Sequence, residues 1–214
     1  MTLVAERSRT AHDLIAEGVP IRKKVAFTSF EESTVEDWAA IVKYGVHEPT
    51  RVLELCLEHL DMLRAPDNVY PVDRYEHSLQ TASRAWRDGR DDDDELIAAA
   101  LLHDIGDFFA PANHGEFCAA ILKPYVRPEV YWIVKYHEMF QGYHFFHHLG
   151  GDRNARDSLR GHPHFEACQK FCDDYDQNAF DPTYDTMPLE AFMPTLNRVF
   201  EKPRRQVNER VQDD

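Results

Sequence analysis

Apolar residues in this sequence recur three and four positions apart, and they almost never alternate with period two. One such series consists of Val52, Leu55, Cys56, Leu60 and Leu63. Apolar positions at i, i+3 and i+4 cover one face of an α-helix, whereas a half-buried strand alternates in steps of two. The sequence therefore predicts an all-α fold.

Capping and turn residues set the limits of the predicted helices. The tetrapeptide Ser33-Thr34-Val35-Glu36 is a capping-box pattern and predicts a helix over 33–44. Pro49 suits the first turn of a second helix, because its missing N–H costs nothing there. Further helices are expected over about 73–88, 94–105, 114–122, 128–140, 164–178 and 188–200.

Length and composition are those of one globular domain. The chain has 214 residues, of which 43% are hydrophobic, enough to bury a substantial core. Residues 1–27 lack a sustained period and are expected to form an N-terminal arm. The helical domain is expected over 28–205, followed by a C-terminal tail over 206–214.

Charge and hydropathy exclude several classes of partner. The net charge of −14 disfavours binding to nucleic acid or to an anionic membrane, because it repels phosphate. The apolar run Leu96–Leu102 is far shorter than the roughly 20 residues of a membrane-spanning helix. No secretory signal is recognisable at the start, and the four cysteines include no C-x-x-C pair. We expect a cytoplasmic protein.

Histidine is the unusual component, with 12 in the chain. The apolar run Leu96–Leu102 leads directly into His103 and Asp104 and stops at Gly106, which places two metal-binding side chains at a buried helix end. A buried His beside an Asp can also be purely structural. Further candidates add weight to a metal site, namely His77, His114, His137 and Asp176.

A His, then a His-Asp doublet, then a distant Asp on a helical core resembles the HD-domain superfamily. Within it, the chain looks most like the mixed-valent di-iron oxygenases, which include myo-inositol oxygenase and organophosphonate-cleaving enzymes. The stretches that carry this resemblance are Glu76-His77-Ser-Leu-Gln80-Thr, Ala-Leu-Leu-His103-Asp104-Ile-Gly106, Asn113-His114, Pro163-His164-Phe165-Glu166, Tyr175-Asp176 and the histidine-rich segment Phe140–Gly150. An HD-type helical bundle is the fold it implies.

The resemblance implies a dinuclear centre of two iron ions, Fe(II) and Fe(III). One ion would be held by His77, His103, Asp104 and Asp176, and the other by His114, His137 and Asp104 as a bridging ligand. Asp173 and Asp174 stay open as alternatives to Asp176. Imidazole and carboxylate suit iron, and they also suit manganese and zinc.

The resemblance also implies an activity. The enzyme would use O2 as co-substrate to cleave the C–P bond of a small 1-hydroxyphosphonate. The expected substrate is (R)-1-hydroxy-2-(trimethylamino)ethylphosphonate, and the expected products are glycine betaine and phosphate. Candidate contacts to such a small-molecule phosphonate are Tyr70, Gln141, His144, His147, His148, Arg160 and His162.

Three other functions fit parts of the same pattern. A metal-dependent HD phosphohydrolase acting on a nucleotide or another phosphoester would use the same ligands, with a metal-bound hydroxide as nucleophile. Polyol cleavage of the myo-inositol type would need basic residues that this chain lacks. A non-catalytic HD protein would be expected to have lost ligands, and all six candidates are present.

Overall fold

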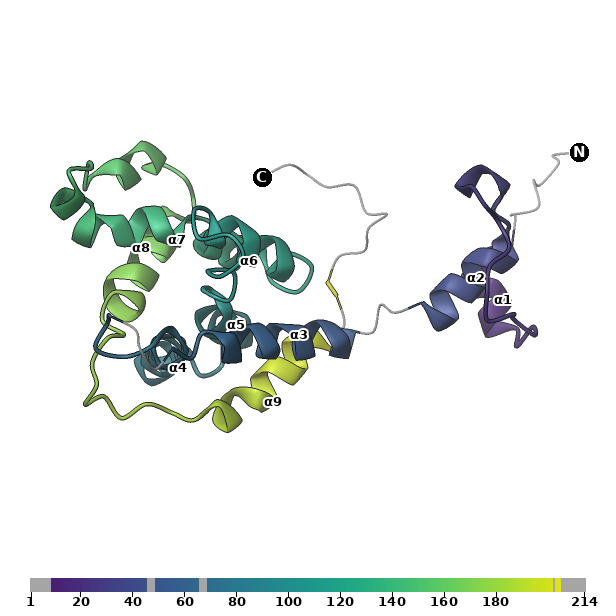
Figure 1. Ribbon diagram of the computed structural model, residues 1–214, viewed down its shortest axis with the longest axis horizontal. Coiled ribbons are helices and arrows are strands. Elements are labelled where there is room, and N and C mark those ends of the chain that lie inside the picture. The colour runs from purple at the N-terminus through teal and green to yellow at the C-terminus, as the bar shows by residue number, and fades with distance from the viewer. Residues whose placement is uncertain (1–8, 46–48, 66–68, 202, 205–214) are drawn as a thin grey trace, which may run out of the picture. The chain divides into compact units, whose positions relative to one another are not determined.

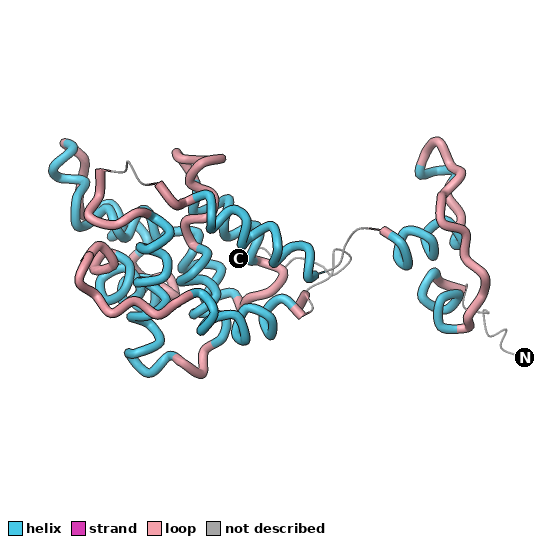
Figure 2. Tube along the Cα trace, turned by 60° about the horizontal axis from the view of Figure 1, so that its bottom comes forward, coloured by secondary structure: helices cyan, strands magenta, loops and turns pink. Residues whose placement is uncertain are grey.

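The computed structural model describes residues 9–45, 49–65, 69–201 and 203–204. Their contacts divide the chain into two compact units, one within Met1–Glu48 and one within Pro49–Asp214. Every regular element in these described ranges is helical (Figure 2), which confirms the predicted all-α class. The tail expected over 206–214 lies outside the described residues.

The first unit contains α1 (Ala11–Ala16), the short 3-10 helix η1 (Phe30–Glu32) and α2 (Val35–Tyr44). Since α2 packs against α1, the domain start predicted at residue 28 falls inside this unit. The capping box of α2 lies one residue later than predicted. Thr34 is the N-cap, and the carboxylate of Asp37 accepts from the Thr34 N–H at 3.0 Å. Asp37 also accepts from Arg22 and Ala26, so contacts with the preceding segment determine which acid completes the box.

The second unit carries the remaining helices (Figure 1). They are α3 (Pro49–Met62), α4 (Arg74–Ala85), η2 (Trp86–Arg90), α5 (Asp94–Leu102), α6 (His114–Leu122), α7 (Pro128–Phe145), η3 (Phe146–Leu149), η4 (Ala155–Leu159), α8 (Phe165–Lys170), η5 (Phe171–Asp176) and α9 (Leu189–Phe200). None of the helices in the described part of the chain is long and apolar enough to cross a membrane.

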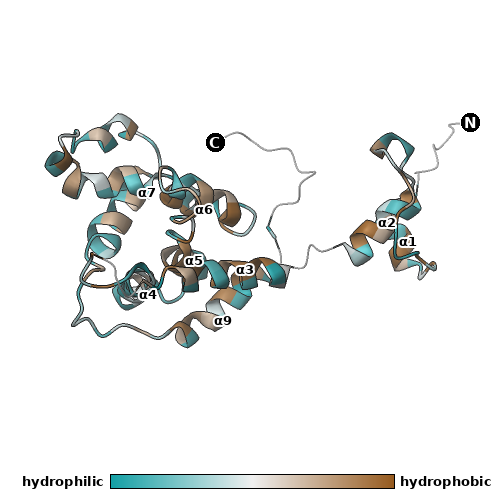
Figure 3. Ribbon diagram, viewed as in Figure 1, coloured by the Kyte–Doolittle hydropathy of each residue, from teal (hydrophilic) through white to brown (hydrophobic). Residues whose placement is uncertain are grey.

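Helix α5 lies in the middle of this unit, where it contacts α4, α7 and α9. Its residues Leu96–Leu102 are all buried, which agrees with the apolar colouring of this helix in Figure 3. The acidic residues before it cap the helix, because the Asp93 carboxylate accepts from the Leu96 N–H at 3.2 Å. Both terminal nitrogens of Arg127 donate to Asp93 at 2.7 Å and so fix this end of the helix.

Helix α7 is longer than predicted, because it continues past residue 140 to Phe145. Gly142 does not interrupt the helix, and a Cβ built on it would lie 2.2 Å from the Phe146 ring. The glycine therefore provides space for an aromatic side chain. The added turns carry Gln141 and His144 on the same side of the helix as His137, since the spacings are four and three residues.

The helix predicted over 164–178 has two parts. It is α-helical in α8 and continues as the π-helical segment η5. A π-turn contains one extra residue, so it shifts the side chains that follow it around the axis, and such turns are frequent at functional sites. This shift determines which of the three downstream aspartates faces the core.

Candidate metal centre

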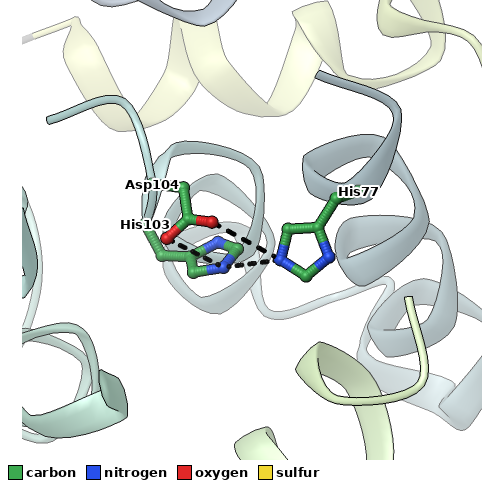
Figure 4. A group of neighbouring side chains, drawn as sticks. All are labelled: His77, His103 and Asp104. Atoms are coloured by element: carbon green, nitrogen blue, oxygen red, sulfur yellow. Dashed lines mark hydrogen bonds and ion pairs between the residues drawn. The ribbon is translucent and has the colours of Figure 1, made fainter. Parts of the chain in front are cut away.

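The His-Asp doublet lies where α5 ends. His103 is the C-cap residue of the helix and is fully buried, and Asp104 follows it in the next turn. His77 comes from the buried face of α4. Figure 4 shows His77, His103 and Asp104 pointing toward one another. The Nε2 atoms of the two histidines are 3.3 Å apart, and His77 Nε2 is 3.5 Å from Asp104 Oδ2.

Asp176 of η5 completes this first group. Its Oδ1 lies 3.2 Å from His77 Nε2 and 3.6 Å from His103 Nε2. Its Oδ2 is buried and has no hydrogen-bond partner. Among the alternatives left open by the sequence, Asp173 pairs with Arg156 and Asp174 is exposed beside Lys170. Asp176 alone of the three therefore faces the centre.

A second group lies on the other side of Asp104. His114, at the start of α6, and His137, in α7, bring their Nε2 atoms to 3.2 Å from each other. Asp104 Oδ1 is 3.1 Å from the His114 nitrogen and 3.3 Å from the His137 nitrogen. The two oxygens of Asp104 thus face different histidines, which is the arrangement expected of a carboxylate that bridges two ions.

Hydrogen bonds at the outer ring nitrogens fix the tautomers of the histidines. The Nδ1–H groups of His77, His103 and His137 donate to the carbonyls of Ala179, Ala100 and Val134 at 3.0, 2.9 and 2.7 Å. Each neutral ring then presents an unprotonated Nε2 to the interior. Facing lone pairs repel one another, and a cation between them removes this repulsion. The donor set of imidazoles and carboxylates therefore fits a metal centre.

The electrostatics favour the same conclusion. Burial alone would lower the pKa of His114, but the carboxylates of Asp104 and Glu138 outweigh this and raise it to about 10. Burial would raise the pKa of Asp104, yet the surrounding histidines hold it well below its ordinary value. The two shifts have one origin, because carboxylates and histidines lie close together in a buried site: the carboxylates favour a positive charge on His114, and the histidines favour the ionised form of Asp104. Ionised carboxylates beside imidazoles attract a proton or a metal cation.

Glu138 supports His114 from outside the centre. Its Oε1 lies 3.0 Å from His114 Nδ1, and its Oε2 accepts from the Gly115 N–H at 3.0 Å. A Cβ on Gly115 would lie 3.0 Å from both Glu138 Oε2 and the Val134 carbonyl oxygen, so this contact leaves little room for a side chain. Sequence reasoning did not assign Glu138 a role, although its position directly after His137 is a usable signal.

We expect Glu138→Gln to weaken binding of the ion at His114 and His137 by about 10- to 100-fold, because a carboxylate partner orients an imidazole ligand and raises its basicity. Competitive titration with a chelator measures this affinity. The other ion, held through His77 and His103, serves as the internal control. Equal weakening of both ions, or of neither, would contradict the assigned role.

A cavity of about 640 Å³ adjoins the centre. It is lined by His77, Asp104 and His114 and by four of the predicted substrate contacts, Tyr70, Gln141, His144 and His148. Gln141 Nε2 donates to Asp176 Oδ1 at 2.7 Å, so it also supports a candidate ligand. The lining includes Arg74, Asp107, Gln177 and Phe180, which the sequence did not single out.

The other three predicted contacts do not line this cavity. His162 stacks on Trp132 with ring centroids 4.2 Å apart, and Arg160 pairs with Asp157 at 2.6 Å. His147 packs against His148 at 3.9 Å between ring centroids. Arg160 and His162 come after Gly150, whose φ of +79° turns the chain away from the axis of α7. Closeness in sequence therefore did not place them at the cavity.

The helical unit and its buried His and Asp groups define a candidate metal-binding helical protein. Residues 74–164 match the family model of the HD domain, which supports membership of the HD-domain superfamily. The matched segment includes five of the six candidate ligands, and Asp176 lies beyond it. No curated protein matches the chain. The superfamily includes metal-dependent hydrolases and oxygenases.

Proposed function

We propose that this protein is an O2-dependent di-iron oxygenase that cleaves the C–P bond of a small 1-hydroxyphosphonate. The observation that supports this most is the position of Asp104, with Oδ1 near His114 and His137 and Oδ2 near His77. Six side chains, one of which is the shared carboxylate, suit two ions. A donor set made only of nitrogen and oxygen atoms suits iron in the Fe(II)/Fe(III) state.

The reaction balances with O2 as the oxidant. The C–H and C–P bonds at the carbinol carbon break, one oxygen atom of O2 enters the carboxylate and the other enters phosphate, and one proton is released. The two irons would activate O2 and bind the substrate hydroxyl. His77, His103, Asp104 and Asp176 would hold one ion, and His114 and His137, with Asp104, would hold the other.

The cavity has groups for both ends of (R)-1-hydroxy-2-(trimethylamino)ethylphosphonate, our proposed substrate. Aromatic faces favour a quaternary ammonium, and Tyr70 and Phe180 line the space. Tyr70 lies against Phe180 with ring centroids 5.5 Å apart, and Phe180 stacks on His77 at 4.4 Å. These rings would shield the centre from water on the side where the ammonium binds.

Oxygen consumption tests this proposal. Anaerobically purified protein, reconstituted with iron, should consume O2 and release phosphate in a 1:1 ratio when the proposed substrate is added. His103→Ala should abolish both signals, because it removes a buried ligand. His12→Ala, which changes an exposed histidine of the first unit, should leave both unchanged.

The second candidate is a metal-dependent phosphohydrolase, which the match to the HD domain also allows. A bridging hydroxide would attack the phosphorus, and no O2 would be consumed. Metal-dependent phosphate release from a panel of nucleotides, with no O2 uptake on the phosphonate, would reject the oxygenase and support this alternative.

A further inference from the structure

The wall of the cavity contains a chain of three polar side chains from three elements. The carboxylate oxygen Oδ1 of Asp173 accepts from His144 Nε2 at 3.0 Å and from Arg156 Nη1 at 2.9 Å. His144 belongs to α7, Arg156 to η4 and Asp173 to η5. Of these three residues, only His144 lines the cavity. Asp173 and Arg156 therefore act on the cavity only through His144.

The π-helical segment aligns this chain with the metal centre. Along α7, Gln141 and His144 face Asp176 and Asp173 of η5, at 2.7 and 3.0 Å. Two hydrogen bonds thus join α7 to η5. The bond from Gln141 supports Asp176, a candidate metal ligand, and the bond from His144 to Asp173 holds a residue of the adjoining cavity wall.

Arg156 holds Asp173 in the ionised form. Arg156 is 5% exposed, and its guanidinium lies 3.9 Å from the centre of the Tyr143 ring, so it has little freedom to move. Burial would raise the pKa of Asp173, but Arg156 and His144 lower it below its ordinary value. An ionised carboxylate accepts a hydrogen bond from the Nε2–H of His144 and leaves Nδ1 for a ligand in the cavity.

We propose, building on the proposed function, that His144 Nδ1 contacts the phosphonate or phosphate oxygen of the substrate, and that Asp173 and Arg156 are positioning residues that fix the His144 ring for this contact. A protonated ring donates from Nδ1 to an oxyanion while Nε2 stays bound to Asp173. Arg74, which also lines the cavity, has its guanidinium paired with Asp107 at 2.8 Å. His144 is thus the residue of the cavity wall that would bind an oxyanion.

Nitrogen-15 NMR of the full-length chain tests the inference directly. The protein is loaded with diamagnetic Zn²⁺, its histidines are ¹⁵N-labelled, and the His144 signals are assigned by their loss in His144→Gln. In the ligand-free wild type, we expect His144 to carry a proton on Nε2; when methylphosphonate is added, we expect Nδ1 to gain a proton as well, with a shift of its signal. In Asp173→Ala, the Nε2 preference should be lost.

Affinity for methylphosphonate provides the second readout. Asp173→Ala should raise its Kd by at least about tenfold, the effect expected when an orienting partner is removed. Asp173→Asn, which keeps an oxygen acceptor, should restore part of the affinity. Asp174→Ala is the matched control, because this neighbouring carboxylate pairs with Lys170 on the surface, and its Kd should stay within about twofold of the wild type.

A wild-type Kd for methylphosphonate in a folded Asp173→Ala protein would overturn the inference. A His144 Nδ1 signal that does not shift when methylphosphonate is added would also overturn it. If Asp173→Ala does not fold, Arg156→Lys takes its place, because it keeps the charge but lacks the planar fork, and binding should weaken by at least about threefold. An unchanged affinity there would also overturn it. If the Nδ1 signal of His144 shifts with methyl phosphate and the protein takes up no O2 with the proposed substrate, the contact between His144 and the oxyanion is supported and the oxygenase is rejected. If the protein takes up O2 but the His144 signal does not shift, only the contact is rejected.

Discussion

Replacing Asp104 with alanine is expected to remove both metal ions of the proposed dinuclear centre. Each group of histidines shares this carboxylate, with His114 Nε2 3.1 Å from Oδ1 and His77 Nε2 3.5 Å from Oδ2. Loss of a bridging ligand should weaken both ions by more than the roughly 100-fold that outer partners contribute. The metal-to-protein ratio, measured by mass spectrometry after reconstitution and gel filtration, should fall from about two to near zero.

Two further variants make this result specific. His137→Ala should lose only one ion, because His77, His103, Asp104 and Asp176 still form a complete set for the other. Asp174→Asn should retain both ions, since that carboxylate pairs with Lys170 on the surface. Retention of both ions by Asp104→Ala would show that the carboxylate is not a bridge. Equal losses in Asp104→Ala and His137→Ala would show that the two ions do not bind separately.

Replacing Phe140 with alanine is expected to lower the free energy of unfolding of the second unit by about 3–5 kcal/mol. The side chain is fully buried in α7, with its ring centroid 4.9 Å from that of Phe165 and 5.7 Å from that of Trp132. Its removal leaves a cavity under the turn that carries Gln141. Urea denaturation followed by circular dichroism measures the change.

Phe108→Ala is the matched control for Phe140. Its side chain is 56% exposed, so truncation removes little buried area and should change stability by less than about 1 kcal/mol. Equal urea midpoints for the two variants would mean that the stability of the second unit does not depend on the packing of Phe140. Because Phe140 is not itself a candidate ligand, the variant should still bind metal under conditions where it is folded.

The helices could be predicted from the sequence because the bonds that form them are local. Backbone hydrogen bonds join residues four apart, so the spacing of apolar residues around Leu96–Leu102 was enough to predict α5 and its burial. The ends were less accurate where distant contacts compete. Asp37 caps α2 partly because Arg22 and Ala26 also bind it, and the local pattern contains neither residue.

The candidate ligands were also recognisable, because the His-Asp doublet at the end of a buried helix is accompanied by His77, His114, His137 and Asp176. The structure brings His77, His103, Asp104, His114, His137 and Asp176 together, and their assignment as metal ligands stays a prediction that the Asp104 variants test. The choice among Asp173, Asp174 and Asp176 depended on the π-helical turn of η5, which the apolar pattern does not reveal.

The sequence by itself determined the helical class, the buried α5 and the residues able to bind metal. Only the tertiary structure decided that residues 28–45 belong to the first unit, that Arg160 and His162 lie outside the cavity, and that Arg156 and Asp173 hold His144. The physical reason is the range of the interactions. Helix formation depends on neighbours a few residues apart, whereas Asp173 meets His144 across 29 positions of the chain, a contact set by how the helices pack.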